Sequence, residues 1–148
     1  MGDAHELSVS RYIAAPPAAV WQAMTMRFEE WWCPLPWRTR IVELDWRPGG
    51  RACMDMLGPD GEVMPNDGKV LDVVPGKRFV FTDAFVGDWQ PAPAFMVGIF
   101  EIAPEGDGTR YTATARHWSA EACQQQREMG FEAGCAAAAA QLAALVEN

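Results

Sequence analysis

The C-terminal segment SAEACQQQREMGFEAGCAAAAAQLAALV, residues 119–146, carries the longest helix signal in the chain. Ser119 suits a helix N-cap, Glu121 places an acid in the first turn, and no proline follows. Alanine is abundant and favours helix. The segment therefore predicts a helix of about 25 residues, roughly 38 Å long, with one apolar stripe. That stripe consists of Cys135, Ala138, Leu142, Leu145 and Val146.

Two glycines interrupt this helix signal. Gly130 and Gly134 are four residues apart, which places them on the same side of a helix. Each glycine costs up to about 1 kcal/mol in a helix interior. Two on one side suggest that another part of the chain approaches closely there. The alternative is that the helix breaks near Gly130 and divides the segment in two.

The rest of the chain reads mainly as short strands. Residues 5–14 alternate apolar and polar side chains, which predicts a strand. A short amphipathic helix follows, entered at Pro16 and Pro17 and ending near Met26. Six more strands then recur about every 10–12 residues, separated by turn signals such as Asp107-Gly108. They cover residues 40–46, 51–57, 68–74, 78–85, 95–103 and 109–118.

This order of elements predicts an α+β helix-grip fold, in which a curved antiparallel sheet wraps around the C-terminal helix. A single antiparallel sheet cannot leave its apolar face in water, and only the C-terminal helix is large enough to cover it. We expect one domain over residues 1–148, with about seven strands and one or two short helices after the first strand. The space between sheet and helix can hold a cavity.

The segment FEEWWCPLPW, residues 28–37, holds three of the seven tryptophans and two prolines. Irregular backbone cannot be deeply buried without partners for its N–H and C=O groups, yet the rings favour burial. The mouth of a cavity satisfies both demands. We therefore expect Trp32 and Trp37 to close one end of an apolar pocket. The alternative is that these rings simply fill the core.

Net charge and cysteine spacing exclude several functions. A net charge of −8 leaves no basic footprint for nucleic acid and disfavours anionic membranes. The N-terminal residues show no signal-peptide pattern, and no apolar run reaches the length of a membrane span. The four cysteines have no CxxC spacing and suit free thiols, so we expect a cytoplasmic protein.

Taken together, several segments resemble the START-like (SRPBCC) superfamily and, within it, the family of activator of heat-shock-protein-90 ATPase homologue-like proteins. These segments are AAPPAAVWQAM (14–24), WW (31–32), RPGGR (47–51), DGKVLDVVPGKRFVFT (67–82), EGDGTRYT (105–112), ARHWS (115–119), EMGFEAG (128–134) and QLAAL (141–145). The resemblance covers nearly the whole chain and implies a helix-grip fold with an internal apolar cavity. It also implies functions that range from hydrophobic-ligand carriage to polyketide cyclisation and chaperone co-factor work.

Two positions depart from the family pattern. Relatives often have Gly-Trp where this chain has Gly134-Cys135. The smaller thiol would free space near the middle of the helix, unless a neighbouring tryptophan fills it. Histidine is also common among relatives where Gln126 stands, which weakens the case for acid–base chemistry on this helix.

Candidate catalytic groups are few. The two histidines, His5 and His117, lack the spacing of a zinc site, and we expect no metal and no cofactor. Asp83 follows two inward-facing phenylalanines at a spacing of two and could act as a general base, as could His117. Cys33 has no nearby base in the sequence.

These observations lead to one primary hypothesis and two alternatives. We expect a small apolar molecule to bind between the sheet and the C-terminal helix, without catalysis. The alternatives are a cyclase- or hydratase-type enzyme that uses Asp83 or His117, and a chaperone-binding module; a homodimer is possible. The residues predicted to line the pocket are Trp32, Trp37, Met54, Met56, Phe81, Met96, Phe100, His117, Phe131 and Cys135.

Overall fold

The computed structural model describes residues 5–147 and contains one large antiparallel sheet and three α-helices. The large sheet is formed by β1 (Glu6–Ile13), β2 (Arg38–Leu44), β3 (Arg51–Leu57), β4 (Val63–Val74), β5 (Arg78–Thr82), β8 (Met96–Glu105) and β9 (Gly108–His117). The helices are α1 (Pro17–Met26), the short 3-10 helix η1 (Phe28–Glu30), α2 (Ala120–Glu128) and α3 (Phe131–Val146). A separate small hairpin joins β6 (Phe85–Val86) and β7 (Gln90–Pro91).

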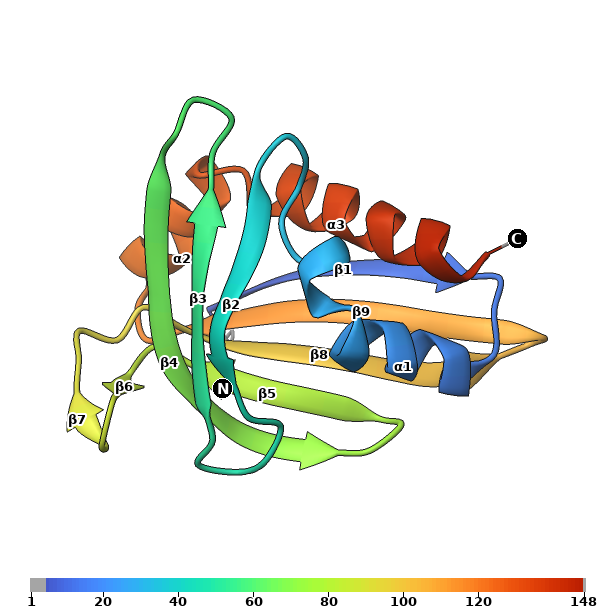
Figure 1. Cartoon of the computed structure of the whole chain (residues 1–148), viewed down its shortest axis with the longest axis horizontal. Helices are drawn as coiled ribbons and strands as arrows, with labels where there is room; N and C mark the ends of the chain where they lie inside the picture. The colour runs from blue at the N-terminus through green and yellow to red at the C-terminus, as the bar shows by residue number, and fades with distance from the viewer. Residues whose placement is uncertain (1–4, 148) are drawn as a thin grey trace.

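The seven strands follow the order β1-β9-β8-β5-β4-β3-β2, and every neighbouring pair is antiparallel. The sheet curves, so that β2, β3 and β4 stand across the direction of β8 and β9, while α1 and α3 lie within the curve (Figure 1). The predicted α+β helix-grip architecture is therefore confirmed, including the short helices after the first strand.

The C-terminal segment is not one long helix. Ser119 caps α2 as predicted, since its hydroxyl oxygen accepts a hydrogen bond from the Ala122 N–H at 3.1 Å. The chain then bends by 61° between α2 and α3. Gly130 has a φ of 90°, in the left-handed region that favours glycine, and this residue makes the bend. The expected unbroken helix was wrong, and the alternative of a break near Gly130 is confirmed.

The expected close approach at the two glycines is only partly found. A Cβ atom added to Gly134 would lie 3.8 Å from Pro34 Cγ, which is ordinary van der Waals contact. A Cβ added to Gly130 would meet nothing within 4 Å. Backbone conformation therefore explains Gly130, whereas packing does not require a glycine at position 134.

Helix α3 packs mainly against β1 and α1. Ala139, Leu142 and Ala143 of α3 are buried there, together with Val20 and Met24 of α1. The prolines at the entry of α1 occupy its N-cap and first turn, where their missing N–H groups leave no helical hydrogen bond unmade. This packing fixes the C-terminal half of α3 against the sheet and leaves α2 and the elbow at the opposite end.

Two strand boundaries differ from the sequence prediction by three residues or more. β4 begins at Val63, five residues earlier than expected, because residues 63–67 continue the ladder with β3. β5 ends at Thr82, and Phe85 belongs to the β6–β7 hairpin instead.

Among residues 5–147, no single helix has the length and apolar composition to cross a membrane, and α2 and α3 reach that length only together, across their bend.

Candidate functional site

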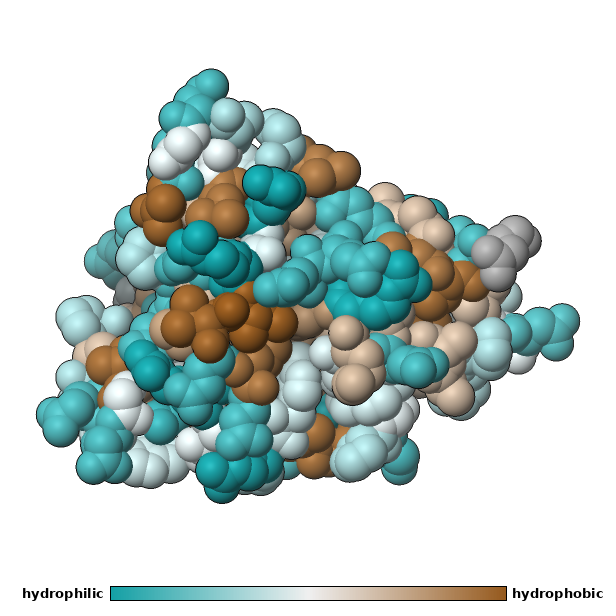
Figure 2. Space-filling view, in the orientation of Figure 1, coloured by the Kyte–Doolittle hydropathy of each residue, from teal (hydrophilic) through white to brown (hydrophobic). Residues whose placement is uncertain are grey.

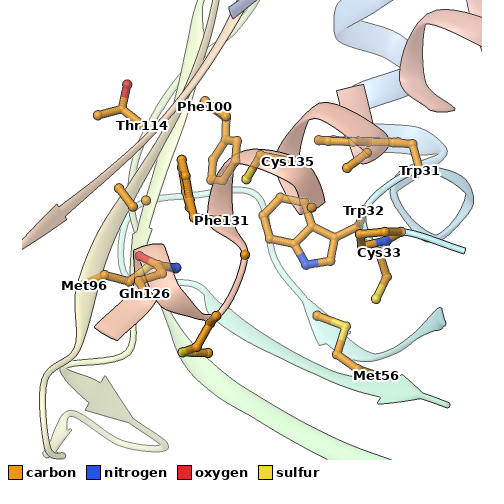
Figure 3. A pocket seen from close by; sticks show the side chains of 18 of the residues that line it. Trp31, Trp32, Cys33, Met56, Met96, Phe100, Thr114, Gln126, Phe131 and Cys135 are labelled. Carbon is orange, nitrogen blue, oxygen red and sulfur yellow. The ribbon is translucent and has the colours of Figure 1, made fainter. Parts of the chain in front are cut away.

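A pocket of about 260 Å³ lies between the sheet and the bend that joins α2 to α3. We call this bend, centred on Gly130, the elbow, and the space beneath it the elbow pocket. Figure 3 shows its labelled side chains, with the Trp32 indole among them. The larger side chains that line it are Trp31, Trp32, Met56, Met96, Phe100, Tyr111, Gln126, Met129 and Phe131.

Small side chains on the sheet create the hollow. Gly98 on β8 and Ala113 and Ala115 on β9 form part of the lining, and Gly134 and Cys135 face them from α3. The methyl groups of Ala113 and Ala115 leave room that a leucine or phenylalanine would occupy. At Gly98, by contrast, the Phe81 and Phe100 rings fill the space beside the backbone. An added Cβ would lie only 2.9 Å from Phe81 Cε1 and 3.0 Å from Phe100 Cε2.

A second pocket of about 300 Å³ adjoins the first. We call it the side pocket. Five residues line both: Trp32, Met56, Met96, Gln126 and Met129. The side pocket is the more polar of the two, since Asn66, Asp67 and Asp83 contribute to its wall beside Met54 and Phe81. The three shared methionines are flexible, unbranched side chains that can adjust to the shape of a guest.

The tryptophan segment closes the elbow pocket, and its irregular backbone is paired by one residue of α3. The Gln141 amide nitrogen donates to the Trp31 and Cys33 carbonyl oxygens at 3.2 and 2.9 Å, and its oxygen accepts from the Leu35 N–H at 2.9 Å. A single carboxamide thus satisfies three backbone groups, and the rings can turn inward. This arrangement answers why so many rings occur in a segment that cannot form a long helix or strand.

The two adjacent tryptophans, Trp31 and Trp32, have different structural roles. Trp31 is fully buried and donates from its indole N–H to the Met24 carbonyl oxygen at 3.3 Å. Trp32 is half-buried; it stacks on Phe28 at 4.5 Å between ring centres and meets Phe100 edge-on at 4.9 Å. Trp31 therefore locks the segment to α1, while Trp32 forms a wall of both pockets.

The structure brings eight of the ten predicted lining residues to the two pockets. Six line the elbow pocket: Trp32, Met56, Met96, Phe100, Phe131 and Cys135. Met54 and Phe81 line only the side pocket. Trp37 and His117 line neither pocket, and their placement was wrong.

Trp37 and His117 were misplaced for different reasons. Trp37 lies beyond the two prolines, directly before β2, and Trp31 takes the position expected for it. His117 faces the same side of β9 as Ala113 and Ala115, but it lies past the end of the pocket and is covered by α2. Strand alternation identified the correct face, but it could not show where along the strand the pocket ends.

Of the larger side chains that line the elbow pocket, sequence reasoning missed four: Trp31, Tyr111, Gln126 and Met129. Tyr111 shares its strand face with Ala113 and Ala115, so the alternation of β9 already contained this signal. Nothing in the sequence distinguished Trp31 from Trp32, or Gln126 from its two glutamine neighbours.

The two predicted general bases, His117 and Asp83, are both engaged in hydrogen bonds within the fold. Nδ1 of His117 lies 3.0 Å from the His5 carbonyl oxygen, and Nε2 faces the carboxamide of Gln126. Asp83 Oδ1 accepts hydrogen bonds from the Phe95 and Met96 N–H groups at 2.9 and 3.3 Å, which fixes the start of β8. Asp83 still borders the side pocket, whereas both ring nitrogens of His117 are engaged.

Ionisable groups in the elbow pocket are neutral at ordinary pH. Burial raises the pKa of the Cys135 thiol to about 11. Burial also raises the pKa of the Tyr111 hydroxyl, with a further contribution from a charge on Cys135. Desolvation raises the pKa of the Cys33 thiol. A pocket with an uncharged, mostly apolar lining favours an uncharged, apolar guest.

Metal binding finds no support in the described part of the chain. No group of three or more histidine, cysteine or acidic side chains among residues 5–147 could hold a metal ion. All four cysteines are free thiols. The site is therefore defined by shape and by a few hydrogen-bonding groups.

A curved seven-stranded sheet, a C-terminal helix and a pocket between them define a START-like helix-grip protein. Residues 14–147 match the family model described as "Activator of Hsp90 ATPase homolog 1-like protein". The chain belongs to this family, and the resemblance stated from the sequence is confirmed. Among proteins with curated descriptions, none matches.

Solved structures agree with this assignment. A crystal structure of a protein from Nitrosomonas europaea is 35% identical, with a TM-score of 0.90, and the match covers 97% of this chain and 96% of that chain. A protein from Mycobacterium smegmatis is 32% identical, with a TM-score of 0.81 and coverage of 97% and 91%. An AHSA1 protein from Silicibacter pomeroyi, at 20% identity and a TM-score of 0.70 over 94% and 95% of the two chains, shares the fold.

Proposed function

We propose that this protein binds a small, uncharged, apolar molecule in the elbow pocket and catalyses no reaction on it. The observation that carries the proposal is the hollow of about 260 Å³ beneath the elbow, where the side chains of β9 that line the pocket include the small Ala113 and Ala115. A well-packed interior of this size has few voids larger than a water molecule. A hollow lined by rings and methionines therefore favours a guest.

Three further features support binding. The neutral thiol and phenol groups of Cys135 and Tyr111 impose no charge on the guest. The methionines shared by both pockets allow the lining to adapt. Burial of apolar area would contribute about 25 cal/mol per Å² to affinity before the entropic cost of association is subtracted.

The experiment uses N-phenyl-1-naphthylamine, an uncharged probe whose fluorescence increases in apolar surroundings. We expect saturable binding to the wild-type protein and loss of that binding in Cys135→Trp, because the indole would occupy the pocket. Ala137→Trp is the matched control, since Ala137 lies on the exposed side of α3. Equal probe binding by Cys135→Trp and the wild type, or absence of binding by the wild type, would contradict the proposal.

Other expectations about partners and location stay predictions. Exposed apolar side chains such as Met26, Val42 and Met64 lie on different elements, and Figure 2 shows hydrophobic patches separated by hydrophilic side chains on the face in view. We propose a cytoplasmic location from the four free thiols. A homodimer and a chaperone partner also stay predictions.

A further inference from the structure

One polar side chain stands where the two pockets meet. Gln126 projects from α2 and lines both the elbow pocket and the side pocket. Its carboxamide lies between His117 and Met96, with the amide nitrogen 3.4 Å from Met96 Sδ and the amide oxygen facing His117 Nε2. Figure 3 shows Gln126 beside Met96. One carboxamide atom, oxygen or nitrogen, is engaged with His117. The other lies beside Met96 and is the atom available to a guest.

His117 is fixed on its far side. The imidazole is buried, and Nδ1 lies 3.0 Å from the His5 carbonyl oxygen. A carbonyl oxygen can only accept, so Nδ1 must carry a proton. Within residues 5–147, the ring also meets the Phe95 ring, with 5.6 Å between ring centres, and the Gln126 carboxamide at Nε2. The protonation of Nε2 therefore decides which way the carboxamide points.

Two arrangements fit the same space, because rotating a carboxamide by 180° exchanges atoms of similar size. If Nε2 carries a proton, the ring is charged, it donates to the Gln126 oxygen, and the NH₂ group lies beside Met96. If Nε2 has no proton, the ring is neutral and accepts from the Gln126 NH₂ group, so the oxygen lies beside Met96. A buried cation requires an opposite charge. Among residues 5–147, the hydrogen-bond and ring partners of this imidazole are a carbonyl, a carboxamide and a phenyl ring, and none of these three groups carries a charge.

We propose that Gln126 is the hydrogen-bonding anchor of the pocket, oriented by a neutral His117 so that its carbonyl oxygen accepts from the hydroxyl group of an apolar guest. Met96 Sδ has no proton to donate, so it leaves this oxygen available. His117 acts here as a positioning residue. The inference rests on the proposed function and narrows the ligand class to apolar alcohols or phenols.

The test compares two probes of the same shape, 2-naphthol and 2-methylnaphthalene, whose affinities are measured by titration of tryptophan fluorescence at neutral pH. A neutral hydrogen bond changes affinity by about fivefold. We therefore expect Gln126→Leu to lower the ratio of 2-naphthol to 2-methylnaphthalene affinity by about fivefold. Gln125→Leu is the matched control, because Gln125 is exposed on the same helix and lines neither pocket.

A second measurement requires no ligand. In ¹⁵N NMR spectra of protein labelled on the histidine ring, we expect His117 Nδ1 to be protonated and Nε2 to be an unprotonated acceptor at pH 8. A proton on Nε2 would overturn the orientation assigned to Gln126.

The outcomes separate the two proposals. An unchanged affinity ratio in Gln126→Leu, with both probes still bound, overturns the anchor and leaves the proposed function standing. Failure of the wild type to bind either probe contradicts both.

Discussion

The two ends of the curved sheet differ in how fully side chains occupy the space beneath the helices. At one end, Phe79 contacts the rings of Trp46 and Trp21, with centres 4.6 and 6.1 Å apart, and it is fully buried. At the other end, Ala113 and Ala115 face the elbow pocket on the same sheet. We call the region around Phe79 the packed end and the region around Ala113 and Ala115 the hollow end. The two differ in the size of the side chains that point inward from the sheet.

Helix α3 shows the same division along its own length. Its second half buries Ala138, Ala139, Leu142 and Ala143. Its first turns, by contrast, are half-buried or exposed and border the pocket. The bend at Gly130 directs α2 away from the axis of α3, so no continuous helix seals the hollow end. Stability should therefore reside mainly at the packed end and binding at the hollow end.

The largest expected effect is at the packed end. Phe79→Ala should lower the free energy of unfolding by about 3–5 kcal/mol, because it removes a fully buried ring from tightly packed neighbours. Phe131→Ala, at the half-buried edge of the elbow pocket, should cost about 1 kcal/mol. Urea denaturation of both variants measures the difference. Equal losses would remove the distinction between the two ends.

An intermediate effect is expected from Cys135, the half-buried thiol of the hollow end. Burial raises the pKa of Cys135 to about 11, so the unfolded thiol loses its proton at a lower pH than the folded one. The contribution of this thiol to the free energy of unfolding is therefore fully present below about pH 9. It is lost as the pH rises toward 11. Each pKa unit corresponds to about 1.4 kcal/mol, and partial exposure reduces the loss to about 2 kcal/mol.

The comparison with Cys135→Ala isolates this contribution. Urea denaturation at several pH values between 8 and 11 should show a steeper decline for the wild type than for the variant. Parallel declines would show that the thiol is not buried in the way described.

A smaller effect of opposite sign should follow from filling the hollow. Cys135→Trp should raise the free energy of unfolding by about 1 kcal/mol, since the ring would bury apolar area in existing space. Ala137→Trp, on the exposed side of α3, should change it by less than about 0.5 kcal/mol. Destabilisation by Cys135→Trp in thermal or urea unfolding would indicate that the space is already filled.

The sequence predicted the architecture because each element had an independent local signal. Alternation identified the strands, the Ser119 cap identified the start of α2, and the need to cover one sheet face placed the C-terminal helix. The bend at Gly130 was only one of two alternatives, because a glycine weakens a helix without requiring it to break.

The candidate site was less predictable than the fold. Alternation selected the correct faces for Met54, Met56, Phe81 and Phe100, which line one pocket or the other. It could not locate His117 past the end of the pocket, because that depends on where α2 crosses β9. Gln126 became recognisable only when the fold placed it beside His117 and Met96.

The central claim is that a guest occupies the hollow end, and the methionine methyl groups test it most directly. In protein labelled with ¹³C at these methyl groups, N-phenyl-1-naphthylamine should shift the NMR signals of Met56, Met96 and Met129, which line both pockets. The signals of Met24, buried at the packed end, and of exposed Met64 should stay in place. Shifts confined to Met24 or Met64 would contradict the claim.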